Sequence, residues 1–137
     1  MTSAWTTSHI SGIVNQPFSK VPLITKDQAR PTIPGMMLWD MWPVQMADGS
    51  IAKIAGGSIW MALSAPDHGD PAGRHFVARI RLLRRVNDRW EDLGQALPDQ
   101  ASPYEREWAG TALLENDIVS LFFTAAGNSD RPRGYQQ

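Results

Sequence analysis

The stretch Gly57-Ser58-Ile59-Trp60-Met61-Ala62-Leu63-Ser64 carries the clearest secondary-structure signal in this chain. Across residues 59–63, large aliphatic side chains alternate with Trp60 and Ala62. A period of two is typical of a β-strand, and apolar residues on both phases indicate a strand that is packed on both faces. The segment therefore predicts a central strand of a β-rich fold.

Neighbouring segments extend the β pattern. The further strands expected are residues 51–54, 76–82, 111–114 and 118–124. Asp48-Gly49 and Glu115-Asn116-Asp117 supply the tight turns of two hairpins. Short antiparallel strands at roughly 10-residue spacing predict an all-β meander, which could close as a sandwich, a barrel or a propeller.

The chain divides into three parts by composition. Residues 1–35 contain four prolines and many Ser and Thr residues, so we expect an irregular segment that wraps over a neighbouring surface. One short turn is expected there at Thr25–Ala29, capped by Thr25. Residues 36–126 form the β region, and residues 127–137 form a polar C-terminal tail.

Composition excludes several classes of function. The 137 residues carry a formal net charge of −1, which gives no electrostatic argument for binding nucleic acid or an anionic membrane. The five arginines of residues 79–89 are interpreted as a solvated strand face. The absence of cysteine excludes disulfides and thiolate chemistry. Neither a signal peptide nor a transmembrane run is visible, so we expect a soluble protein, and its compartment stays open.

Leu38-Trp39-Asp40-Met41-Trp42-Pro43 places one carboxylate between two indoles, in a segment with no other charge. Glycosyl transfer with retention needs a nucleophilic carboxylate and a second carboxyl about 5 Å away, while aromatic rings stack on the sugar. Asp40 is therefore a candidate nucleophile. The alternative is that Asp40 caps a turn and that Trp39 and Trp42 are core residues.

Arg106-Glu107-Trp108-Ala109-Gly110-Thr111 places another tryptophan at the head of an apolar run. Adjacent residues of a strand point to opposite faces, so if Trp108 faces a site, Glu107 does not. Glu107 is conceivable as a catalytic acid. Its simpler interpretation is an ion pair with Arg106 or with a nearby strand residue. The three histidines have no metal-ligand spacing, and we assign no role to His9, His68 or His75.

Taken together in their order and spacing, these motifs resemble glycoside hydrolase family 68, the bacterial levansucrases and β-fructofuranosidases. The resemblance rests on residues 38–45, 47–50, 57–64 and 106–111, and it covers roughly residues 20–126. It implies part of a five-bladed β-propeller, namely the first blade and part of the next, with a central pocket.

The resemblance also implies roles for four residues. Asp40 would be the nucleophile that takes up the fructosyl unit of sucrose, and Trp39 and Trp108 would line the fructosyl subsite. Ala109 stands where many relatives have a serine that hydrogen-bonds near the nucleophile, which leaves Asp40 with one side-chain partner fewer. No cofactor is implied, and no acidic cluster supports a metal site.

Two landmarks of the family are absent from the sequence: the Arg-Asp-Pro motif with its stabilising aspartate, and the later motif with the acid/base glutamate. Asp130-Arg131-Pro132 has similar letters in another order and is not accepted as a substitute. We therefore expect the nucleophile-bearing subunit of a split sucrose-acting enzyme, with a second polypeptide supplying the remaining blades and both carboxylates. The alternatives are a non-catalytic carbohydrate-binding or regulatory remnant, and a fragment that does not fold alone.

Overall fold

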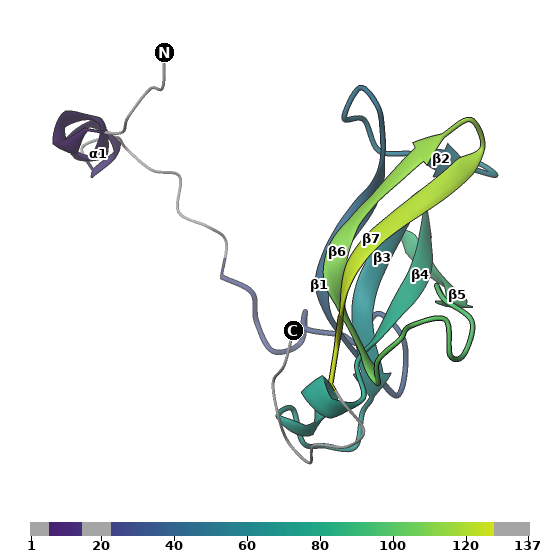
Figure 1. The fold of residues 1–137 in the computed structure, drawn as a ribbon. Helices are drawn as coiled ribbons and strands as arrows, with labels where there is room; N and C mark the ends of the chain where they lie inside the picture. Colours follow the sequence, from purple (N-terminus) through teal and green to yellow (C-terminus); the bar gives the residue numbers. More distant parts are fainter. Residues whose placement is uncertain (1–5, 15–22, 128–137) are drawn as a thin grey trace. The chain divides into compact units, whose positions relative to one another are not determined.

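The computed structural model describes residues 6–14 and 23–127, which belong to two compact units, residues 1–30 and 31–137 (Figure 1). The first unit contains helix α1, Thr7–Val14. The expectation of a segment without helices over residues 1–35 is therefore wrong for this stretch, because an eight-residue helix forms in spite of its Ser and Thr content.

The turn expected near Thr25 is present. The backbone N–H of Gln28 donates to the carbonyl oxygen of Thr25 at 3.0 Å. The side chain of Gln28 closes the turn from the other end, because its Oε1 accepts from Thr25 N at 2.9 Å and from Thr25 Oγ1 at 3.2 Å. Thr25 is thus a donor to a side chain, not the cap of a backbone N–H.

The second unit is a sheet with one short 3-10 helix. Its elements are β1 Met36–Met46, β2 Lys53–Ile54, β3 Gly57–Pro66, η1 Gly73–Phe76, β4 Arg79–Val86, β5 Arg89–Gln95, β6 Arg106–Glu115 and β7 Ile118–Ala126. The strand order is β5-β4-β3-β1-β6-β7, and β2 pairs with β3. Phe76, expected in a strand, lies in η1, and strand β5 was not expected.

Two antiparallel groups make up this sheet (Figure 1). The first group is the four-stranded meander β1-β3-β4-β5, and the second is the hairpin β6-β7. They are joined by a short parallel pairing of β1 with β6, from Val44 opposite Ala112 to Met46 opposite Leu114. Parallel neighbouring inner strands, each starting an antiparallel meander, are the arrangement of successive propeller blades.

The core lies where these two groups meet. Val44, Ile59, Leu63, Ile80 and Ala112 are buried there. Strand β3 is buried on both faces from residue 61 to residue 65, which confirms the interpretation of its apolar pattern. Among residues 6–14 and 23–127, no helix has the length and hydrophobicity needed to cross a lipid bilayer.

The arginine run is neutralised along the β4-β5 hairpin. Arg81 pairs with Asp92 at 2.9 Å, and Arg84 pairs with Glu91 at 2.5 Å. Such partly exposed pairs contribute little to stability, about 0–1 kcal/mol each. The run is therefore part of a paired strand surface, as its sequence pattern indicated.

Candidate functional site

Asp40 lies at a β-bulge in the innermost strand of the first blade. Trp39 is opposite Leu63 and Trp42 is opposite Met61, so two residues of β1 face the single residue Ala62 of β3. Asp40 is exposed and has φ +46°. The other non-glycine residues with positive φ among the described residues lie in turns, so Asp40 alone has this strained conformation inside a strand. Strained backbone and bulges occur preferentially at functional sites.

The bulge also decides where the two tryptophans point. Residues three apart on a regular strand face opposite sides, whereas cross-strand neighbours share a side. The extra residue therefore puts Trp39 and Trp42 on one face, with Leu63 and Met61, and both pack against the core. The alternative that Asp40 caps a turn is wrong, whereas the packing of both tryptophans against the core is confirmed.

A second bulge lies in β6, at the corresponding place in the next blade. Trp108 is opposite Thr124 and Gly110 is opposite Phe123, which leaves Ala109 as the extra residue. The chain passes very close to β7 here, since a Cβ on Gly110 would lie 1.8 Å from the carbonyl oxygen of Phe122. Glycine is required at this position for lack of space.

The parallel register brings these two bulges to the same level of the fold. Val44 is opposite Ala112, and Asp40 and Trp108 each lie four residues earlier on their own strands. Both positions thus occupy the same end of the two inner strands. The sequence motifs around Asp40 and Trp108 are therefore neighbours in the structure.

A histidine links the two tryptophan motifs. The ring of His75, in η1, is edge-to-face with Trp39 at 5.8 Å between centroids, and it stacks on Trp108 at 5.7 Å with an interplanar angle of 17°. The guanidinium carbon of Arg74 lies 4.8 Å from the centre of the Trp39 ring. Residues from β1, η1 and β6 thus form one cluster, called here the aromatic cluster: Trp39, Arg74, His75 and Trp108.

The aromatic cluster contains polar atoms without partners. Trp39 Nε1, Arg74 Nε and His75 Nδ1 are buried and have no hydrogen-bond partner among the described residues. Such atoms are costly to bury unless a ligand or another protein segment satisfies them. The first two can only donate, whereas the ring nitrogen of His75 can donate or accept.

Glu107 points away from this cluster. Its side chain is 5% exposed, its Oε2 accepts a hydrogen bond from Ile80 N at 2.6 Å, and its Oε1 lies 3.9 Å from Arg79 Nη1. The expected ion pair is confirmed, with Arg79 as the partner. Glu107 thus fastens β6 to β4.

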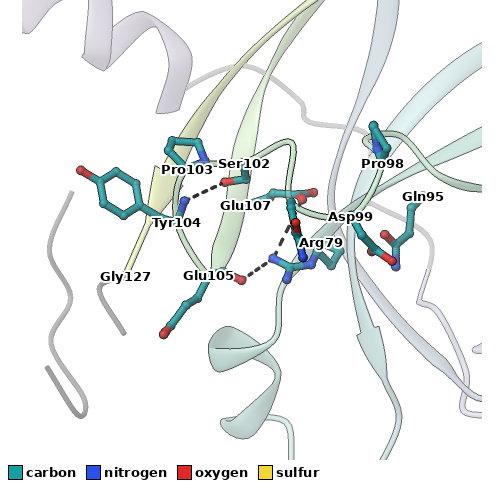
Figure 2. Close-up of a pocket in the computed structure, with 11 residues that line it drawn as sticks. Arg79, Gln95, Pro98, Asp99, Ser102, Pro103, Tyr104, Glu105, Glu107 and Gly127 are labelled. Carbon is teal, nitrogen blue, oxygen red and sulfur yellow. Dashed lines mark hydrogen bonds and ion pairs between the residues drawn. The ribbon is translucent and has the colours of Figure 1, made fainter. Parts of the chain in front are cut away.

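The polar pocket beside Glu107 is a separate feature (Figure 2). It has a volume of about 340 Å³, and the loop between β5 and β6 forms much of its wall. Arg79 crosses it to reach the carbonyl oxygen of Glu105. None of the aromatic cluster lines this pocket, so it is not the predicted site.

The structure places all four predicted site residues at the same end of the two inner strands: Asp40, Trp39, Trp108 and exposed Ala109. The sequence prediction missed Arg74 and His75. They follow a loop that contains Pro71 and Gly73, and they belong to no motif with a recognisable spacing of functional residues. Among residues 6–14 and 23–127, no group of three or more His, Cys, Asp or Glu side chains is arranged to hold a metal ion. Asp130-Arg131-Pro132 lies outside the described residues, as does the rest of the tail beyond residue 127.

Comparison with known proteins gives consistent results. A family model described as levansucrase/invertase matches residues 1–136. The levansucrase Lscgamma of Pseudomonas syringae pv. actinidiae is 29% identical over 133 residues, covering 80% of this chain and 30% of that protein. An inactive levansucrase of Geobacillus stearothermophilus is 29% identical over 104 residues, covering 66% of this chain and 21% of that protein.

Among solved structures, the inulosucrase from Halalkalicoccus jeotgali bound to kestose superposes with a TM-score of 0.75 at 33% identity, over 85% of this chain and 29% of that chain. This chain therefore spans about 30% of the length of the relatives that it matches. Its strands correspond to the first blade and part of the next blade of a five-bladed propeller. The chain belongs to the levansucrase/invertase family, glycoside hydrolase family 68.

Proposed function

We propose that this chain carries the nucleophile of a sucrose-acting β-fructofuranosidase or fructosyltransferase, and that Asp40 is that nucleophile. The observation that carries the proposal is the position of Asp40: an exposed carboxylate on a strained bulge, next to Trp39 of the aromatic cluster and level with Trp108. The names of the family and of the relatives, levansucrase and inulosucrase, agree with sucrose as the substrate class.

The reaction proceeds in two displacements. A carboxylate oxygen of Asp40 attacks the anomeric carbon of the fructosyl unit, and the electron pair of the glycosidic bond passes to the glucose oxygen, which is protonated by an acid. Water or a sugar hydroxyl then attacks the same carbon and gives its proton to the same group. The bond to Asp40 breaks, and the carboxylate is restored.

The aromatic cluster binds and shields the sugar in this scheme. Trp39 and Trp108 line the fructosyl subsite with the ring surface that Arg74 and His75 leave uncovered. His75 sits between the two indoles and fixes their separation. Ala109 has no hydroxyl group, so hydrogen bonds that orient the Asp40 carboxylate have to come from other residues.

A second polypeptide supplies the acid/base and stabilising carboxylates, together with the remaining blades. A retaining mechanism needs a second carboxyl roughly 5 Å from the nucleophile. Glu107, next to Trp108 in the sequence, is committed to Ile80 N and Arg79. This chain also spans only about 30% of the length of its relatives, so the missing groups have to come from outside the described residues.

The test is complementation. This chain is co-expressed with the part of the Halalkalicoccus jeotgali inulosucrase that follows the matched segment, and sucrose cleavage is measured. Asp40→Asn should reduce turnover by at least about 10⁴-fold without impairing assembly. Asp48→Asn, at a hairpin turn, is the matched control and should keep activity. Substantial cleavage by the Asp40→Asn variant would refute the role of Asp40.

A second function, carbohydrate binding without catalysis, is favoured by two observations. The chain has Ala109 where the family resemblance implies a serine, and one relative is described as an inactive levansucrase. This alternative predicts that the chain alone changes its tryptophan fluorescence on addition of sucrose or a fructan, and that no assembled form cleaves sucrose. Activity in the complementation assay would exclude it.

A further inference from the structure

The polar pocket beside Glu107 takes no part in the proposed reaction, although it lies at the same end of the fold as the aromatic cluster. Glu107 and Trp108 are consecutive residues at the start of β6, and adjacent residues of a strand point to opposite faces. Trp108 belongs to the aromatic cluster, whereas Glu107 lines the pocket. The first residues of β6 therefore separate the pocket from the proposed fructosyl subsite.

The floor of the pocket contains a buried carboxylate that its neighbours satisfy only in part. Oε2 of Glu107 accepts the hydrogen bond from Ile80 N. Oε1 lies 3.9 Å from Arg79 Nη1, which is beyond hydrogen-bonding distance, and that same Nη1 donates to the carbonyl oxygen of Glu105. Within the described part of the chain, Oε1 therefore keeps its capacity to accept a hydrogen bond from a ligand.

Polar side chains lie on both sides of this floor. Figure 2 shows Gln95 and Asp99 on one side of Arg79, and Ser102 and Glu105 on the other. Among residues 6–14 and 23–127, the side chains of Gln95 and Asp99 make no hydrogen bond or ion pair. Both are therefore available to a ligand in the pocket.

The loop that forms the wall is folded on itself, so the pocket is preformed, as small-molecule sites usually are. Ala101 N donates to the carbonyl oxygen of Pro98 at 3.1 Å, and Ser102 Oγ accepts from Tyr104 N at 3.4 Å. Gln100 also lines the pocket and has φ +66°, a conformation that is strained for a residue other than glycine.

The lining residues favour a neutral polyhydroxyl ligand. Three carboxylates and one guanidinium line the pocket, which disfavours an anion, and the apolar side chains are limited to two prolines and Tyr104. An organic cation would meet Arg79 at the floor and would leave the N–H donors of Gln95 and Gln100 without acceptors. Hydroxyl groups both donate and accept, so they can satisfy the carboxylates, the amides and the guanidinium together.

We propose that this pocket is an accessory site for a sugar unit of an oligosaccharide, outside the fructosyl subsite. Its volume of about 340 Å³ falls within the range of small-molecule sites. Glu107 Oε1 and the Asp99 carboxylate accept from sugar hydroxyls, and Arg79 and Gln95 donate to them. The choice of ligand rests on the proposed function, since oligosaccharides are products of fructosyl transfer. A product held on the other side of β6 stays near the active site and can act again as an acceptor.

NMR titration of the full chain with kestose tests the site. The backbone amides of Ser102, Glu105 and Gly127 report on the pocket, and the indole N–H groups of Trp39 and Trp108 report on the aromatic cluster. The three amides should shift in a saturable way, with half-saturation in the millimolar range, because the pocket offers a few hydrogen bonds at a solvent-exposed surface.

Two variants and a control isolate the lining side chains. Asp99→Ala removes a charged acceptor and should weaken binding about tenfold, and Gln100→Gly removes the amide from a backbone conformation that glycine accepts and should weaken it about threefold. Asp88→Ala is the matched control, because Asp88 is an exposed turn residue that does not line the pocket. Equal binding by the Asp99→Ala and Asp88→Ala chains would overturn the inference.

The remaining outcomes separate the accessory site from the function on which its ligand rests. Shifts confined to the indoles of Trp39 and Trp108, or no shifts, would overturn the accessory site and leave the role of Asp40 standing. Shifts of the pocket amides with argininamide but not with kestose would show a cation site and would also overturn it. Pocket binding of kestose, together with sucrose cleavage by the Asp40→Asn complex, would support the accessory site and refute the proposed nucleophile.

Discussion

Replacing Gly110 by alanine should destabilise the second unit strongly, because the added methyl group would clash with the backbone of β7. Its Cβ would lie 1.8 Å from the carbonyl oxygen of Phe122 and 2.8 Å from the Cα of Phe123. Both neighbours are backbone atoms of β7, so no side-chain rotation relieves the contact. The β6-β7 pairing would have to open around the bulge that precedes Gly110.

The magnitude follows from the contact. Overpacking a well-packed site costs about 1–3 kcal/mol and sometimes more, and a backbone contact this short belongs at the upper end, so we expect a loss of at least about 3 kcal/mol. For a domain of this size that corresponds to a fall in Tm of more than about 12 °C. Thermal unfolding of the full chain, followed by circular dichroism, measures it.

Gly49→Ala is the matched control. Gly49 has φ +82° and nothing within 4 Å of an added Cβ, so this variant carries backbone strain without a steric clash. Its expected cost is about 1–2 kcal/mol. If Gly110→Ala unfolds at the same temperature as Gly49→Ala or above it, the close approach of β6 and β7 at the bulge is refuted.

Three further predictions concern the stability and titration of the same unit. Glu107→Ala leaves Ile80 N–H buried without an acceptor and should cost about 1–3 kcal/mol in a urea titration, whereas Glu107→Gln keeps an acceptor and should cost less; equal losses would contradict the assigned hydrogen bond. Leu63→Ala empties a fully buried site and should cost about 2–5 kcal/mol, so a loss below about 1 kcal/mol would be inconsistent with the core described. The hydrogen bonds from the side chain and backbone of Ser50 hold the pKa of Asp48 below its ordinary value of 3.8, so the stabilisation is present above that value and is lost as the pH falls through the lowered pKa. Ser50→Ala removes the larger cause and should raise the pKa of Asp48 toward 3.8 in an NMR titration, and an unchanged pKa would argue against it.

Strands in which apolar and other residues alternate regularly could be predicted from the sequence. A strand whose pairing depends on charged side chains could not. The pattern of residues 59–63 predicted β3, and the turn at residues 115–117 predicted the β6-β7 hairpin. Strand β5 was not predicted because its apolar residues, Trp90 and Leu93, are three positions apart and so do not show a period of two. The pairing of β5 with β4 is also irregular near Gly94. Its pairing with β4 is supported by charged side chains, which a search for apolar periodicity does not detect.

The candidate site was predicted only where its residues lie in compact motifs. Asp40, Trp39 and Trp108 belong to such motifs, and their proximity depends on the parallel register of β1 and β6, which no local pattern encodes. His75 was assigned no role, because a lone histidine after a loop has no signal in the sequence. Its place between two indoles follows from the fold, since it comes from a third segment.

The central claim is that Asp40 forms a covalent bond to the fructosyl unit. The most direct test is rapid acid quenching of the co-expressed complex with sucrose, followed by digestion and mass spectrometry of the peptides. The account predicts one fructosyl adduct on the peptide that contains Asp40, and none in the Asp40→Asn variant. Turnover with the adduct on another residue, or on the partner polypeptide, would contradict it.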